Sequence, residues 1–284
     1  MHIKDLFARG KTIVSLEVSP PKSKSASDGA IATIEAVKEF NPAFVSVTYG
    51  AGGSSRDYTV EIADRVKNRH GLETLSHLTC VGTGRGEIDQ ILSRLKEKNI
   101  SNILAMRGDM PQEGIPIKSD YTYAQDLIRH LKKAGDFCIA AACYPEGHLE
   151  CESLTLDRQH LKEKVNSGVD FLITQLFFSN HLFYRFREEL AAWGIQIPVL
   201  AGIMPILSRG QLAHLAKLCR VSIPPRLEKI ITRFENDPQS LRAAGIDFAL
   251  EQILDLKASG VDGIHLFTLN RPEVAREIFA ALAN

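Results

Sequence analysis

TIVSLEVSPPK, residues 12–22, predicts the first strand of the chain. Apolar side chains at positions 14, 16 and 18 alternate with polar ones at 15, 17 and 19, a pattern typical of a strand with two different faces. Pro20 and Pro21 end the strand, because neither can donate a backbone hydrogen bond. Glu17 is therefore expected near the carboxyl end of this strand. There it is either a charge facing water or an acid–base group at the mouth of a barrel.

Strand and helix patterns alternate from this stretch to the end of the chain. Further strands are predicted at 43–48, 74–79, 102–106, 137–143, 171–175, 197–201 and 263–267. Helices are predicted at 30–40, 56–68, 87–98, 123–134, 154–167, 181–193, 208–219, 224–235, 238–259 and 272–283. This alternation predicts one α/β domain over residues 1–284, a parallel eight-stranded (β/α)₈ TIM barrel with extra helices before the last strand. An open doubly wound sheet is the alternative, but the GxGxxG turn that marks it is absent after the first strand.

The composition narrows the class of partner. The 34 basic and 34 acidic side chains cancel, which argues against nucleic acid or an anionic membrane held by bulk charge. No apolar run reaches the roughly 18 residues of a membrane span, and the N-terminus has no signal-peptide core. The 5 cysteines show no metal-ligand spacing. We therefore expect a cytoplasmic protein with reduced thiols, no membrane span and no metal.

Polar groups stand at most of the predicted strand ends, where a TIM barrel carries its active site. Their alternative role is simply to face water at the barrel mouth. No strand ends in the lysine of a Schiff-base enzyme, no GxSxG elbow is present, and the histidines lack a neighbouring carboxylate cluster for a metal. The remaining groups suit proton transfer around a large polar heterocycle. The residues at these ends are Glu17, Thr48, His77, Arg107, Asp109, Tyr144, His148, Gln175, Asn270 and Arg271.

Motifs at these ends resemble the methylenetetrahydrofolate reductase family, in its bacterial form with the catalytic barrel alone. They occur in the family's order over nearly the whole chain. Single motifs such as RGDxP are weak, but together they are specific. They are the Glu17 strand with its Pro-Pro, FVSVTYGAGG (44–53), HLTC (77–80), NILAMRGDMP (102–111), AACYPEGH (141–148), DFLITQLFF (170–178), GIMP (202–205) and FTLNR (267–271).

The resemblance implies a flavin-dependent oxidoreductase of one-carbon metabolism that supplies methionine biosynthesis. Glu17 would be the general acid that opens the five-membered ring of 5,10-methylenetetrahydrofolate. Asp109 would stabilise the resulting 5-iminium cation, which takes a hydride from reduced flavin to give 5-methyltetrahydrofolate. The folate-contact positions are Glu17, Asp109, Gln175 and Arg271. The FAD positions are Thr48, His77, Arg107, Gly108, Asp109, Tyr123, Ala142, Tyr144, His148, Asp157 and Lys164.

Several of these residues have simpler interpretations. Arg107 and Asp109 could form a surface salt bridge, and Lys164 could lie on the solvated face of its helix. A role at a helix surface or cap is open for Tyr123 and Asp157, and Gln175 could only cap the barrel mouth. The aromatic helix 181–193 could belong to the core or to the interface of a homo-oligomer, and the core is the more conservative prediction.

The sequence departs from the family pattern near the cofactor and the electron donor. His160 and Glu163 stand where relatives tend to have Asn and Arg, and Phe267 stands where some have Tyr. Residues 206–210, ILSRG, lack the aromatic that some NADH-using bacterial members offer to the nicotinamide. The donor is therefore either NADH or a partner protein, which would make the chain one subunit of a larger reductase. A barrel lyase without flavin is a third hypothesis, which the Arg107–Asp109 segment fits poorly.

Overall fold

Eight parallel strands close into a barrel in chain order, each paired with its neighbours along the chain and the last with the first. The computed structural model describes residues 1–21, 29–49, 53–109 and 119–283. The predicted (β/α)₈ fold class is therefore confirmed, and the open sheet is excluded. The strands are β1 (Ile13–Val18), β2 (Val45–Val47), β3 (Thr74–Thr79), β4 (Asn102–Met106), β5 (Cys138–Cys143), β6 (Phe171–Thr174), β7 (Val199–Ile203) and β8 (Gly263–Phe267).

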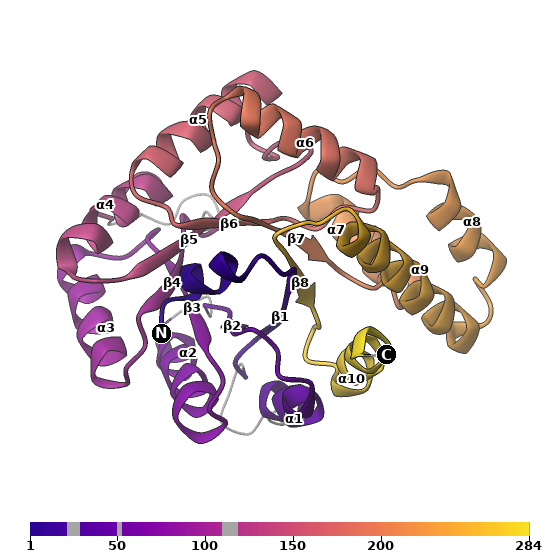
Figure 1. Ribbon diagram of the computed structural model, residues 1–284, viewed down its shortest axis with the longest axis horizontal. Coiled ribbons are helices and arrows are strands. Elements are labelled where there is room, and N and C mark those ends of the chain that lie inside the picture. The colour runs from indigo at the N-terminus through magenta and orange to yellow at the C-terminus, as the bar shows by residue number, and fades with distance from the viewer. Residues whose placement is uncertain (22–28, 50–52, 110–118, 284) are drawn as a thin grey trace.

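Helices surround this ring of strands (Figure 1). The predicted extra helices before the last strand are α8 and α9, which with α7 cover their own apolar cluster beside the barrel. Among the described residues no helix is long and apolar enough to cross a membrane. The helices are α1 (Gly29–Val37), α2 (Gly53–Asp64), α3 (Arg85–Glu97), α4 (Ala124–Ala134), α5 (Leu154–Asn166), α6 (Asn180–Ala192), α7 (Arg209–Leu218), α8 (Pro225–Arg233), α9 (Pro238–Ala258) and α10 (Pro272–Ala283).

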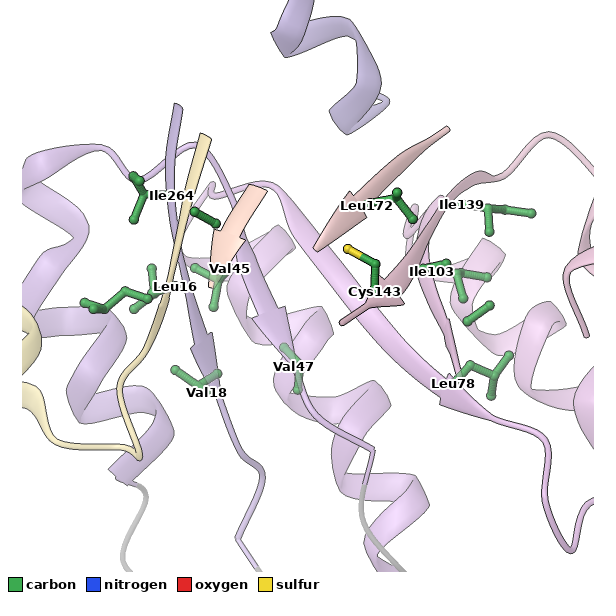
Figure 2. Close-up of a cluster of buried hydrophobic side chains, with 14 of the residues drawn as sticks. Leu16, Val18, Val45, Val47, Leu78, Ile103, Ile139, Cys143, Leu172 and Ile264 are labelled. Carbon is green, nitrogen blue, oxygen red and sulfur yellow. The ribbon is translucent and has the colours of Figure 1, made fainter. Parts of the chain in front are cut away.

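Alternate strand positions point to opposite sides of the barrel wall, as the period of a strand requires. Figure 2 shows Leu16 and Val18 of β1 with Val45 and Val47 of β2 in the large cluster that joins the strands to the helices. The positions between them, including Glu17, face the interior. The alternation read from residues 12–22 thus separates a helix-packing face from a face that carries polar groups.

A short 3₁₀ helix, η1 (Ile3–Arg9), closes the amino-terminal end of the barrel. Its buried Ile3 and Leu6 pack with interior residues of strands β3 to β7, including Phe171, and with Phe44 just before β2. Asn102 on β4 fixes the helix, because its Oδ1 accepts a 2.8 Å hydrogen bond from the Ile3 backbone. The sequence was interpreted here only as lacking a signal-peptide core, so this closing element was missed.

Two strand boundaries differ from the prediction. The seventh strand was predicted at 197–201 and runs from Val199 to Ile203, because Pro198 has no N–H to donate to the ladder. The second was predicted at 43–48 and is assigned only to Val45–Val47, although the Ala43 and Thr48 N–H groups still bond to β1 carbonyls. Helix 56–68 is replaced by α2 and a π turn, Arg65–Arg69. Residues 50–52 and 110–111 of the family motifs lie outside the described residues.

The aromatic helix belongs to the core, as predicted. Phe183 and Phe186 of α6 are buried, while Tyr184 and Trp193 pack against the same cluster from its edge. The Tyr184 hydroxyl donates a 2.6 Å hydrogen bond to Asp255 on α9. These contacts give the aromatic side chains a role within one chain.

Candidate active site

Glu17 and His77 meet inside the mouth of the barrel. They come from β1 and β3, which are not neighbours, so both side chains must point inward. The Glu17 Oε2 and His77 Nε2 atoms are 3.7 Å apart, and His77 is only 4% exposed. The His77 Nε2 atom is buried and has no hydrogen-bond partner among the described residues. A carboxyl and a ring nitrogen without a hydrogen-bond partner in the described part of the chain thus lie close together inside the barrel.

Burial controls the protonation of this pair. It raises the pKa of the Glu17 carboxyl to about 8, although 22% of the side chain is still exposed. It lowers the pKa of His77 to about 3, so the imidazole is neutral. Since removal from water penalises the charged form of each group, Glu17 carries its proton at neutral pH. The surface-charge interpretation of Glu17 is therefore wrong, and the side chain has the properties of an acid.

A second group of predicted residues gathers on the loop after β5. The rings of Tyr144 and His148 meet edge to face, with centroids 4.7 Å apart. Asp157 accepts a 3.0 Å hydrogen bond from the His148 N–H and pairs with Arg158 at 2.8 Å. Burial lowers the pKa of His148 and raises that of Tyr144 to about 12. Asp157 thus holds the loop main chain rather than capping its own helix.

Arg107 binds Glu150 and not Asp109. Its Nη1 and Nη2 atoms donate hydrogen bonds of 2.6 and 2.8 Å to the two oxygens of the Glu150 carboxylate. This fork raises the pKa of Arg107, chiefly through the hydrogen bond to Glu150. The alternative of an Arg107–Asp109 salt bridge is wrong, although Arg107 does make an ion pair. Asp109 is exposed.

Gly108 lets the chain turn between these two residues. Its φ is +89°, and a β-carbon there would lie 2.9 Å from Val81 Cγ1 and 3.0 Å from Thr79 Cβ. Glycine is the residue that adopts this left-handed conformation without a steric penalty. The motif glycine therefore allows the loop to stay close to the end of β3.

Lys164 does not lie on a solvated helix face. It reaches back from α5 to the end of β5, where its Nζ donates a 2.5 Å hydrogen bond to the Ala142 carbonyl. Burial lowers its pKa. Lys164 is therefore a half-buried amine at the end of β5.

The remaining predicted residues are less constrained. Gln175 follows β6, and its Oε1 accepts a 2.9 Å hydrogen bond from the Leu176 N–H. Thr48 is half-buried after β2, and its carbonyl accepts from Thr59. Tyr123 is 57% exposed at the start of α4, and Arg271 is exposed after β8. The structure does not bring these last two into contact with Glu17.

The departing residues lie on the outside of α5. His160 and Glu163 are both exposed, and Glu163 accepts a hydrogen bond from Gln159. Arg158, between them and Asp157 in the chain, is buried instead and donates to the Tyr144 and Pro145 carbonyls. The guanidinium of Arg158 on α5 is therefore bound to the loop after β5.

Sequence reasoning missed Glu150, Arg158 and Thr268. Glu150 follows His148 by two residues, which was a weak signal for a partner of Arg107. Arg158 has no local signal, because its partners lie at the end of β5 and on α6. The Thr268 hydroxyl donates a 2.6 Å hydrogen bond to the Glu17 carbonyl, a contact between the two ends of the chain.

The donor set fits an anionic flavin nucleotide. Lys164 supplies a half-buried cation, and Arg107 supplies a second if it releases Glu150. The unpaired His77 Nε2 can bond to a polar ring atom. These features occur at the ends of three neighbouring strands, β3, β4 and β5.

Several known proteins are similar to this chain in sequence. The chain matches the family model described as methylenetetrahydrofolate reductase over residues 2–283. It is 37% identical over 270 residues to the 5,10-methylenetetrahydrofolate reductase of Pectobacterium carotovorum subsp. carotovorum, with 95% of this chain and 90% of that protein covered. It is 34% identical over 282 residues to methylenetetrahydrofolate reductase (NADH) 1 of Arabidopsis thaliana, covering 94% of this chain but 48% of that protein.

Solved structures also share the fold, and one of them is described here. A protein from Clostridium thermocellum that binds two copies of 5-methyl-5,6,7,8-tetrahydrofolic acid superposes with a TM-score of 0.62. The match covers 99% of this chain and 98% of that chain at 14% sequence identity. At that identity the likeness supports the barrel architecture alone.

Proposed function

The chain belongs to the methylenetetrahydrofolate reductase family, and we propose that it reduces 5,10-methylenetetrahydrofolate with FAD as cofactor and Glu17 as general acid. Reduction of methylenetetrahydrofolate is the activity that the family name states. The observation that carries the proposal is Glu17 itself. Its carboxyl lies inside the barrel mouth, 3.7 Å from a neutral imidazole, with a pKa raised to about 8.

Glu17 acts as the proton donor in this proposal. The substrate's imidazolidine ring opens when one of its nitrogens is protonated, and a carboxyl that is uncharged at neutral pH can deliver that proton. Asp109 is exposed and follows directly after the Gly108 turn. A carboxylate there stabilises the cationic iminium that ring opening produces. Gln175 and Arg271 complete the folate contacts, and the product is 5-methyltetrahydrofolate.

The proposed cofactor residues lie on two sides of the mouth. When bound, FAD supplies the hydride that completes the reduction. Lys164 and Arg107 provide positive charge for its diphosphate, and His77 offers a hydrogen bond from inside the barrel. The other residues proposed to hold the cofactor are Thr48, Gly108, Asp109, Tyr123, Ala142, Tyr144, His148 and Asp157.

The electron donor is NADH in this proposal, as the names of the plant relatives suggest for those proteins. The second candidate is a partner protein that reduces the flavin. It is favoured by the segment Ile206–Gly210, which offers no aromatic side chain to stack on a nicotinamide. We further propose that residues 1–284 form one catalytic unit. This unit would work in the cytoplasm and could assemble into a homo-oligomer.

Two half-reactions test the function. The purified protein is expected to show flavin absorbance, to lose it on reduction by NADH or a dye donor, and to regain it with methylenetetrahydrofolate. Glu17→Gln should keep the first step and lose the second by about a hundredfold or more, since a general acid contributes on that order. Glu97→Gln, exposed on α3, is the matched control. A protein that binds no flavin would exclude the cofactor, and reduction only by a partner would exclude NADH.

A further inference from the structure

A buried histidine lies beneath Glu17 inside the barrel. His265 on β8 is only 1% exposed. Its Nδ1 atom is 2.8 Å from the Ser15 hydroxyl, and its Nε2 atom is 3.1 Å from the Ser46 hydroxyl. One ring therefore joins β8 to β1 and β2. The proposed reaction assigns no role to His265 or to either serine.

His265 contacts every strand position that borders Glu17 from below and from the sides. Ser15 precedes Glu17 by two residues on β1 and faces the same side. Ser46 and Phe267 are the register partners of Glu17 on β2 and β8. The Phe267 ring meets the imidazole edge to face, with centroids 5.5 Å apart. The imidazole thus lies one side-chain layer below Glu17. We call His265, with the Ser15 and Ser46 hydroxyls, the floor below Glu17.

The hydrogen bonds select one tautomer. The Ser15 hydroxyl is 3.1 Å from the Ile264 carbonyl and can donate to it, which leaves Ser15 Oγ to accept from the ring. His265 then carries its proton on Nδ1, and Nε2 must accept. The Ser46 hydroxyl is the donor to Nε2. In this arrangement each of the three side-chain protons has an acceptor, and the Ser46 O–H points at the ring.

The ring also carries no charge. Burial, and to a smaller extent the nearby His77, lower the pKa of His265 to about 3. His77 has a pKa lowered to about 3 as well, so both imidazoles are neutral at neutral pH. A cation or a free hydroxyl donor under Glu17 would favour the carboxylate form, because hydrogen bonds to a charged form stabilise it. The observed floor offers neither.

We propose that His265 is a positioning residue for proton donation by Glu17, and that it does so by engaging the Ser46 hydroxyl, which would otherwise donate to the Glu17 carboxylate. The inference rests on the proposed function for its catalytic consequence, but the arrangement itself exists in the protein without cofactor. A purely structural role for His265 would affect stability alone. A positioning role also changes the acidity of Glu17.

The first test uses the protein without flavin. In ¹⁵N spectra of the histidine rings, we expect His265 as the Nδ1–H tautomer, with no titration between about pH 5 and 9. In ¹³C spectra of the glutamate carboxyls, His265→Leu should lower the apparent pKa of Glu17 by about one pH unit, as a new hydrogen bond from Ser46 predicts. His214→Gln, exposed on α7, should leave it unchanged.

A double variant separates the mechanism from general disruption. His265→Leu combined with Ser46→Ala removes the freed donor, so the Glu17 pKa should return to near its wild-type value. If His265→Leu does not fold, Ser46→Ala alone and His265→Asn, which preserves a donor near Nδ1, provide the comparison. Ser46→Ala should leave the Glu17 pKa unchanged, and His265→Asn should lower it. An unchanged Glu17 pKa in the His265 variant, or no recovery in the double variant, overturns the inference.

Kinetic measurements of the two half-reactions then test whether His265 affects turnover. In His265→Leu, reoxidation of the flavin by methylenetetrahydrofolate should slow by about tenfold at pH 9, because a fall of one unit from a pKa of about 8 lowers the protonated fraction of Glu17 about tenfold there. Reduction by a dye donor at the same pH should change less than about twofold. Equal losses in the two steps would mean a structural role and overturn the inference. A wild-type protein that reduces no folate would overturn the proposed function instead, and the spectra of the flavin-free protein would still decide the role of the floor.

Discussion

The main chain of α9 touches the main chain of the loop after β7 at Gly245 and Ile206. A β-carbon on Gly245 would lie 1.8 Å from the Ile206 carbonyl oxygen and 2.8 Å from its carbon. Glycine in the middle of a helix normally weakens it by about 1 kcal/mol relative to alanine. Here it allows the helix backbone to approach the loop that follows the GIMP motif.

Gly245→Ala should therefore destabilise the protein by about 3 kcal/mol, because the added methyl group must push the loop and the helix apart. Urea unfolding measures this. Gly210→Ala near the start of α7 is the matched control, since a β-carbon there meets nothing within 4 Å. If both substitutions have the same small effect, the close approach does not matter for stability.

The Arg107–Glu150 fork predicts an effect on flavin affinity. Glu150 occupies the guanidinium that is proposed to bind the diphosphate, and its charge repels a phosphate. Glu150→Gln should therefore lower the Kd for FAD by about threefold to tenfold, an effect that high salt weakens. Fluorescence quenching of FAD measures it. Glu152→Gln, exposed in the same loop, should have little effect. Weaker binding by Glu150→Gln would instead mean that Glu150 holds Arg107 in place.

Glu17 predicts an unusual pH dependence of stability. Its pKa is raised to about 8 in the folded protein, against 4.5 as the ordinary value, so the folded state binds the proton more tightly. This contribution is complete below about pH 4.5 and is lost as the pH rises to about 8, by up to about 1.4 kcal/mol per pH unit. Glu17→Gln should therefore be more stable than wild type at pH 8, and the difference should shrink toward pH 5.

The comparison with the Gln variant isolates this effect from the histidines. His77 and His265 have pKa values lowered to about 3, so their stability contribution is lost as the pH falls from about 6.5 to 3, in both proteins. Urea unfolding of wild type and Glu17→Gln at three pH values measures the difference in their free energies of unfolding. A stability difference that does not vary with pH would mean that Glu17 titrates normally.

Arg158 holds the loop after β5. It is buried, pairs with Asp157 and Glu189, and donates to two loop carbonyls. Arg158→Met should cost about 3–5 kcal/mol, because it leaves buried charges and carbonyls unpaired. Arg185→Met is a matched control, since Arg185 pairs with the same Glu189 but is 51% exposed. It should cost less than about 1 kcal/mol in thermal or urea unfolding. Equal costs would contradict the assigned role of Arg158.

The barrel could be predicted because each strand carries its own signal. The alternation around Glu17 and the repeated change from strand to helix depend on neighbouring residues in the chain. The start of β7 was misplaced because Pro198 has no N–H for the sheet ladder, and local hydropathy does not reveal such a missing hydrogen bond. The closing helix η1 was missed because its apolar residues gain partners only from distant strands.

The site was predictable in its residues and less so in their partners. Glu17, His77 and Lys164 stand at strand ends or reach them, as the family motifs imply. Glu150 and His265 depend on contacts across 43 and 250 positions of the chain, Arg107 to Glu150 and Ser15 to His265. Such pairs form only when the barrel closes, so no pattern of nearby residues reports them.

The closing helix η1 has a consequence for the order of folding during synthesis. The rings of Phe7 and Phe171 pack with centroids 5.4 Å apart, and the Ile3 N–H donates a hydrogen bond to Asn102 Oδ1. A ribosome makes the amino-terminal residues first, yet Asn102 emerges only with β4 and Phe171 only with β6. The first apolar residues of the nascent chain therefore have no native contacts when they are made, and η1 can close the amino-terminal end of the barrel only late in synthesis.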